Sequence, residues 1–528
     1  MPSPCSQCGA FVLPADDVLL DRTPHTLARL AQLSASDEPP GDAELSILRP
    51  IVEKTSKRLT LLDEEIPRLK DRLQELETER TALSESHAQN IRILSPLRRI
   101  PAEILGEIFS WSLPSHWDVL DVRNCPWVLT HVCRRWRAVA LSMTSLWSLI
   151  SVDFETKPQY PRAMISTQIE RARSLKIHFF GYEDCDASSQ IALFELLAIH
   201  SHRWEELSIQ LTSHLGPCVM KDRDLTALRR TWVQWHNAES QTPEFNSVDF
   251  LRTATSLVEI GVCCDFRFLP TRLPTHHQLT RYDFDAPWRT HVELLKSLPN
   301  IQAARISRHF DNFNDWPEPG DPIDLPHLRR LYVTDHPCLD YLRTPRLEEL
   351  AIALNATDNK GPDESLEHLL KRSSCIPRCL RIQGHLDAQS TAAILQKNPS
   401  FTEFGVTDED ENEDAQRRIL STFLTLFTIS NSTPSAMLPH IMKISFASES
   451  GDSTLYPLFL DMLESRWKPE ESVLKVSELM FRKPSLPCPD PQSLARIEAL
   501  RESGLKISLL SGDDMDTCVE HWLCKVGW

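Results

Sequence analysis

The sequence predicts an α/β protein in which a helical arm and a small all-α unit precede an irregular α/β solenoid. Three patterns support this prediction: a heptad repeat near the N-terminus, two short amphipathic helices after it, and a recurring apolar pattern that continues toward the C-terminus. A chain of 528 residues is long for a single hydrophobic core, so several structural units are expected. We expect them at residues 1–42, 43–94, 95–150 and 151–528.

Composition and charge narrow the class of function. Hydrophobic residues make up 41% and charged residues 25% of the chain, which is typical of a folded protein. The net charge of −17 repels phosphate backbones and therefore disfavours a nucleic-acid partner. No apolar stretch reaches the ~20 residues of a membrane-spanning helix, so no membrane partner is expected. The N-terminus does not resemble a secretory signal, and we expect an intracellular protein, cytoplasmic and/or nuclear, with reduced thiols.

Residues 1–42 predict a mostly flexible tail, because proline, glycine, serine and aspartate are frequent in its second half. Cys5 and Cys8 have the spacing of half a zinc site. A structural zinc site needs four ligands, and no second pair follows at the usual spacing. Two thiols in a tail are the simpler interpretation.

Residues 43–94 predict a long helix, because apolar residues recur at alternating steps of three and four in the manner of a coiled-coil seam. Pro67 falls inside the pattern and is expected to kink the helix or to restart it. Two arrangements fit the pattern: self-association through residues 43–94, or an arm that folds onto its own chain. The apolar positions are Leu48, Val52, Leu59, Leu62, Ile66, Leu69, Leu73, Leu76 and Leu83.

Residues 95–150 predict two short amphipathic helices. Pro101 suits the first position of a helix, and Glu103 suits the positive end of its dipole. The second helix is expected from about Trp127 to Leu141. Helices this short bury too little surface to be stable alone, so they need each other and a partner. The apolar stripe of the first helix comprises Ile104, Leu105, Ile108 and Phe109, and that of the second includes Leu129, Val132, Cys133, Trp136 and Val139.

These two segments together resemble an F-box. The motif reads Leu97-x-x-Ile100-Pro101-x-Glu103-Ile104-Leu105-x-x-Ile108-Phe109, then Val132-Cys133-Arg134-Arg135-Trp136-Arg137 and Leu146-Trp147. More narrowly, the chain resembles the expanded F-box family of mushroom-forming (agaric) fungi, in which a heptad-rich helix often precedes the motif. The stretch between the two halves, which contains His116-Trp117-Asp118, is longer than in a minimal F-box, so an inserted loop is expected.

The resemblance implies a non-catalytic role in ubiquitin-dependent protein degradation. F-box proteins bind the S-phase-kinase-associated adaptor, and through it cullin, in SCF-type cullin–RING ubiquitin ligases, and they bind a protein substrate through the rest of the chain. A scaffold or regulatory interaction protein that uses the F-box without a ligase is the alternative. The resemblance places the adaptor contact at Leu97, Ile100, Pro101, Ile104, Leu105, Ile108, Phe109, Val132, Cys133 and Trp136.

Residues 151–528 contain a weak repeat of the form apolar-x-x-apolar-x-apolar. Several copies are spaced by roughly the 20–29 residues of a leucine-rich repeat, and helical stretches lie between them. This alternation predicts an irregular solenoid of strands and helices, whereas a generic α/β domain is the simpler alternative. The last apolar residues of the clearest consecutive copies are Val262, Phe284, Ile306, Val333, Ile352, Ile382 and Val406.

No catalytic or metal-binding motif is found in the sequence. With 14 glycines, the chain has no glycine-rich phosphate loop, and it lacks the Gly-x-Ser-x-Gly and His-Glu-x-x-His motifs. Cys263-Cys264 and His276-His277 are adjacent pairs, but neighbouring strand residues point to opposite faces. The acidic run at residues 408–414 is expected to be an exposed loop. We therefore expect no enzyme activity, metal or cofactor.

Overall fold

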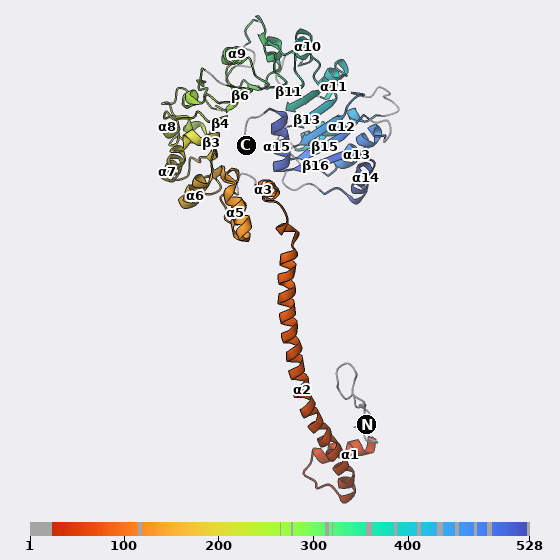
Figure 1. Ribbon diagram of the computed structural model, residues 1–528. Coiled ribbons are helices and arrows are strands. Elements are labelled where there is room, and N and C mark those ends of the chain that lie inside the picture. Colours follow the sequence, from red (N-terminus) through yellow and green to blue (C-terminus); the bar gives the residue numbers. More distant parts are fainter. Residues whose placement is uncertain are drawn as a thin grey trace. The chain divides into compact units, whose positions relative to one another are not determined.

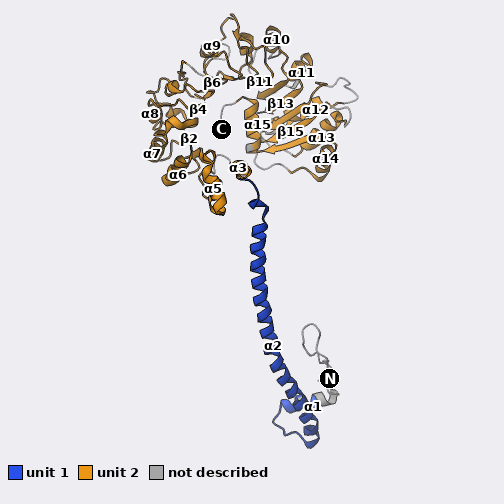
Figure 2. Cartoon of the chain, viewed as in Figure 1, with its two compact units in different colours: residues 1–101 blue, residues 102–528 orange. Residues whose placement is uncertain are grey.

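The computed structural model divides into two compact units, residues 1–101 and residues 102–528 (Figure 2). It describes residues 24–114, 119–264, 266–275, 278–311, 316–318, 320–354, 362–384, 388–408, 413–429, 437–448, 453–468, 473–482 and 488–524. Cys5, Cys8, the segment 116–118, the pair 276–277 and most of the acidic run 408–414 lie outside these residues.

The first unit consists mainly of one long helix, as the heptad pattern predicts. Helix α2 (Asp42–Leu94) runs for 53 residues and passes through Pro67 without ending. Its start is stabilised by the Glu44 carboxylate, which accepts a hydrogen bond of 2.8 Å from the backbone N–H of Gly41. Helix α1 (Pro24–Ser34) precedes it, inside the segment for which the sequence predicts a flexible tail, and a short 3₁₀ helix, η2 (Pro96–Arg98), follows it.

The second unit begins with short helices. They are α3 (Ala102–Trp111), α4 (Leu129–Val132), α5 (Arg134–Ser142) and the 3₁₀ helix η4 (Thr144–Trp147). The single helix expected from Trp127 to Leu141 is instead broken at Cys133, which has extended backbone angles. The Sγ atom of Cys133 accepts a hydrogen bond from the backbone N–H of Trp136 and so caps α5.

A parallel sheet of 14 strands forms the rest of the second unit, so the predicted α/β class is confirmed. The strands are paired in the order in which they occur along the chain. They are β1 (Leu149–Asp153), β2 (Leu175–Phe180), β3 (Trp204–Leu211), β4 (Arg230–Trp235), β5 (Glu259–Val262), β6 (Arg281–Asp285), β7 (Ala303–Ser307), β9 (Arg330–Val333), β11 (Glu349–Leu354), β12 (Cys379–Gly384), β13 (Glu403–Asp408), β14 (Lys443–Ser448), β15 (Val476–Phe481) and β16 (Lys506–Ser511). A second, two-stranded sheet pairs β8 (Ile323–Asp324) with β10 (Leu342–Arg343).

Helices connect many of the strands and cover one face of the sheet, which we call the outer face (Figure 1). They are α6 (Arg162–Arg171), α7 (Ala187–Ala198), α8 (Gly216–Val219), α9 (Trp288–Ser297), α10 (Pro362–Ser373), α11 (Ala388–Lys397), α12 (Glu413–Phe427), α13 (Leu455–Arg466) and α14 (Pro491–Glu502). The last helix, α15 (Asp513–Trp522), lies on the opposite, inner face.

The repeated apolar positions of the sequence form the core of this arrangement. In β5, Ile260 and Val262 are buried, and the register pairs Val262 with Val233 of β4 and with Phe284 of β6. Because parallel strands in register place equivalent positions side by side, one pattern repeated along the sequence becomes a continuous apolar layer.

Candidate functional site

Helices α3 and α5 pack against each other through side chains that are among the predicted contact residues. Leu105 and Phe109 are each only 1% exposed. The Phe109 ring lies 4.9 Å from the Trp136 ring, in a tilted arrangement. Gly106 occupies the middle of α3 because a Cβ atom there would lie 2.5 Å from Sδ of Met143.

Two tryptophans join these short helices to the start of the sheet. Trp147 is buried, its ring lies edge-on 5.1 Å from the Trp127 ring, and its indole N–H donates a 2.8 Å hydrogen bond to the carbonyl of Ala140. The guanidinium of Arg171, on α6, lies 4.3 Å from the centre of the Trp147 ring. The short helices are therefore supported by the sheet and its first covering helix.

The neighbouring side of α3 presents apolar side chains to solvent. Ile104 is 52% exposed, Ile108 45% and Trp111 87%, and these positions are spaced along one side of the helix. Val132 of α4 is also exposed, at 54%. We call Ile104, Ile108 and Trp111 the α3 stripe. An exposed apolar stripe on a well-supported helix is typical of a protein-binding surface.

Two of the predicted contact residues are buried in the structure of the free chain. Leu105 and Phe109 lie inside the helical unit, because α5 and Met143 cover that side of α3. Trp136 is half-buried against Phe109, whereas Cys133 is exposed. Trp111 is not among the predicted contact residues, because the predicted stripe ends at Phe109, but it follows Ile104 by seven residues and extends the exposed side of the helix.

The remaining predicted contact residues precede the second unit. Leu97 is 52% exposed, Pro101 is exposed, and Ile100 is half-buried. All three residues belong to the first unit, whereas the α3 stripe belongs to the second unit.

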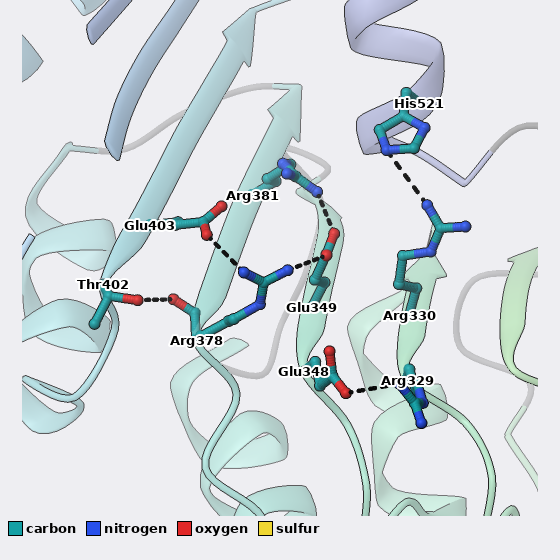
Figure 3. A network of polar contacts seen from close by, with 9 residues as sticks. All are labelled: Arg329, Arg330, Glu348, Glu349, Arg378, Arg381, Thr402, Glu403 and His521. Atoms are coloured by element: carbon teal, nitrogen blue, oxygen red, sulfur yellow. Dashed lines mark hydrogen bonds and ion pairs between the residues drawn. The ribbon is translucent and has the colours of Figure 1, made fainter. Parts of the chain in front are cut away.

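The inner face of the sheet carries charged residues of alternating sign near the start of its strands. The Arg378 guanidinium donates to Glu349 at 2.9 Å and to Glu403 at 3.0 Å, and Arg381 donates to Glu349 at 3.0 Å (Figure 3). Burial alone would raise the pKa of Glu349, but the arginines Arg381 and Arg378 lower it below its usual value. Similar pairs join Arg281 to Glu259 and Lys443 to Glu478.

Helix α15 covers much of the inner face. Its buried residues pack on strand residues that are mostly small or apolar, and Trp522 lies over Gly405, 3.4 Å from where a Cβ atom would be. The Nε2 atom of His521 lies 3.4 Å from the Arg330 guanidinium (Figure 3). The Leu523 carbonyl accepts a hydrogen bond from Arg305. The cluster comprises Tyr332, Ala351, Ala447, Met480, Met515, Val519, Trp522, Leu523 and Cys524.

A pocket of about 300 Å³ lies on the inner face at strands β4 to β7. Gly261, which has no side chain, stands between Trp232 and Asp283 in the register and leaves room for it. The Asp285 carboxylate accepts a 2.7 Å hydrogen bond from His309 and raises the pKa of that imidazole. The pocket is lined by Trp232, Gln234, Val262, Cys263, Asp283, Asp285, Arg305, Ser307 and His309.

Within the described residues, no cluster of three or more histidine, cysteine, aspartate or glutamate side chains is arranged to hold a metal ion. Among the described helices, none combines the length and the apolar character needed to cross a membrane. A comparison with protein-family models finds no match to this chain, and a search of curated proteins finds no significant match.

Proposed function

We propose that this chain is a substrate-recognition adaptor of an SCF-type cullin–RING ubiquitin ligase. In this proposal, residues 95–150 are an F-box that binds the S-phase-kinase-associated adaptor and, through it, cullin. Residues 151–528 are an irregular leucine-rich-repeat-like solenoid that binds a protein substrate. The observation that carries the proposal is the α3 stripe, because Ile104, Ile108 and Trp111 are exposed on the helix that matches the first half of the F-box motif.

The role requires no chemistry from the chain itself. A substrate held beside the ubiquitin-charged enzyme of the ligase reacts as if the step were intramolecular, because tethering raises its effective concentration. A binding surface for the substrate is available on the inner face of the sheet. Since α15 packs on strand residues from Tyr332 to Met480, we place the substrate contact at β4 to β7, around Trp232 and Asp283.

The experiment compares adaptor binding by two double variants of the full chain. Ile104→Arg with Ile108→Arg puts two charges into the proposed contact, and removal of such a central contact typically costs ~2–4 kcal/mol, or roughly 30- to 1000-fold in affinity. Both residues are exposed, so the variant should fold normally, as measured by circular dichroism and melting temperature. We expect it to lose the co-purifying adaptor and cullin.

The matched control is Ile199→Arg with Leu494→Arg, which makes the same kind of change at exposed residues of the outer helical layer. This control should bind the adaptor like the unmodified protein. Undiminished binding by the Ile104, Ile108 variant would refute the F-box proposal. Adaptor binding without cullin would instead support the scaffold alternative. Leu105→Arg is not a suitable test, because Leu105 is buried and its substitution would disturb folding.

A further inference from the structure

Helix α2 carries an apolar seam that the described residues of the first unit leave exposed. No residue of α2, all of which the structure describes, is buried. Exposed apolar side chains in a soluble helix of this length indicate a surface that another chain covers. The exposed fractions are 60% for Val52 and Leu59, 46% for Ile66, Leu69 and Leu76, 58% for Leu73 and 62% for Leu83.

The seam follows the seven-residue repeat of a coiled coil. Val52, Leu59, Ile66 and Leu73 occupy position a, and Leu62, Leu69, Leu76 and Leu83 occupy position d. Three to four heptads of this kind are enough to predict a coiled coil. Two of these four a positions, Val52 and Ile66, are β-branched and all four of these d positions are leucine, which is compatible with two strands. The two prolines of α2 occupy outer positions of the repeat and do not interrupt the seam.

Helix α1 is too short to cover the seam. It has 11 residues and is therefore roughly 16 Å long, whereas the 53 residues of α2 span roughly 80 Å. The contact between the two helices that can be identified is at the start of α2, where the Arg29 guanidinium lies 2.8 Å from the Glu44 carboxylate. The seam from Leu59 to Leu83 lies farther along the helix.

The charges beside the seam are complementary to those of a second copy. In a parallel pair in register, each residue at position g faces position e of the next heptad of its partner. The three facing pairs have opposite charge: Arg58 with Asp63, Glu65 with Lys70, and Arg72 with Glu77. An antiparallel pair centred between Ile66 and Leu69 also sets opposite charges together, because Glu65 then faces Arg72 and Asp63 faces Lys70.

We propose that α2 forms a two-stranded coiled coil with α2 of a second copy of this chain. The charges at positions e and g of α2 are complementary to those of another α2, and this identifies the second helix as a copy of the same chain. A different partner would not require such self-complementarity. The sequence leaves two arrangements open, and the charges beside the seam favour self-association. The proposal does not depend on the F-box, because no residue of the α3 stripe takes part.

The test measures the mass of the full chain in solution at tens of micromolar by light scattering or sedimentation equilibrium. We expect twice the 60.4 kDa of one chain. Leu69→Glu with Leu76→Glu should give a monomer, because it places charges in the seam. The control, Gln74→Glu with Thr78→Glu, adds the same charges on the outer side of α2 and should leave the dimer intact.

Two charge-block variants test whether the helix recognises itself. The acidic variant has only acidic residues at positions e and g from residue 58 to residue 77, and it carries Arg58→Glu, Lys70→Glu and Arg72→Glu. The basic variant has only basic residues there, and it carries Asp63→Lys, Glu65→Lys and Glu77→Lys. Each variant alone should be monomeric, and an equimolar mixture should recover the dimer mass. A monomeric unmodified protein would overturn the proposal. So would a dimer that persists in the Leu69, Leu76 variant, or acidic and basic variants that each dimerise alone.

Discussion

At the scale of single residues, the surroundings of a buried polar side chain determine its protonation. His291 is fully buried between a hydroxyl and a carbonyl. The Ser307 carbonyl, 2.8 Å from Nε2, can only accept a hydrogen bond, so Nε2 carries the proton. Nδ1 therefore accepts a 2.7 Å hydrogen bond from the Tyr282 hydroxyl. Burial lowers the pKa of His291 to about 4, so the imidazole is neutral at neutral pH.

This lowered pKa predicts that the protein loses stability in mild acid. As the pH falls below the ordinary histidine pKa, the unfolded chain takes up a proton at His291, whereas the folded chain does so only near pH 4. The free energy of unfolding should therefore fall between about pH 6.5 and pH 4, by up to ~3 kcal/mol from this group. Urea unfolding at pH 7, 5.5 and 4 measures the loss.

The matched variant is His291→Gln, whose amide can both donate and accept a hydrogen bond but does not titrate. It should be less stable at pH 7 and should lose less free energy of unfolding on acidification than the unmodified protein. Equal losses in the two proteins would contradict the assignment of this pH dependence to His291.

At the scale of secondary-structure elements, α15 stabilises the inner face of the sheet. Met515, Val519 and Trp522 are buried against strands from β9 to β15. The Arg381 guanidinium lies 5.5 Å from the centre of the Trp522 ring. Because one short helix contacts strands that are far apart in the sequence, we expect it to couple the unfolding of those strands.

Trp522→Ala tests this role of α15. Truncation of a buried tryptophan typically lowers the free energy of unfolding by ~3–5 kcal/mol, so the melting temperature should fall clearly. The same substitution at Trp111, which is 87% exposed, serves as the control and should change the melting temperature little. If Trp522→Ala lowered the melting temperature no more than the control does, α15 would not stabilise the sheet.

At the scale of the whole molecule, the 14 strands of the large sheet in the second unit are paired without a break. Strand β9, for example, pairs with β7 on one side and with β11 on the other. Each strand buries its apolar residues against its neighbours, and within the described residues of the second unit these 14 strands do not divide into separate sheets that could form independent cores. We therefore expect the second unit to unfold cooperatively.

A chain that ends after Val333 tests this expectation. It leaves β9 as an unpaired sheet edge and removes α15, so it should be insoluble or readily cleaved by protease. Deletion of residues 1–90 is the control, because it cuts outside the second unit and should leave that unit folded and able to bind the adaptor. A soluble fragment with its own cooperative melting transition would instead indicate separate domains.

The sequence by itself determines the features that depend on local patterns. The heptad seam predicts the long helix α2, because the spacing of its apolar residues matches the period of a helix and depends only on the local sequence. The recurring pattern around Ile260 and Val262 likewise predicts strands that align in register. A strand buries alternate residues, so its core positions can be identified without knowledge of its neighbours.

Only the tertiary structure decides which side of a local pattern is covered. Leu105 and Ile108 belong to the same apolar stripe of the sequence, yet only Leu105 is buried, because α5 and Met143 lie on its side of α3. The position of α15 is a second case, since Trp522 meets Gly405 from more than a hundred residues away. Such contacts form between segments that are far apart in the sequence. A local pattern of residues therefore does not predict them.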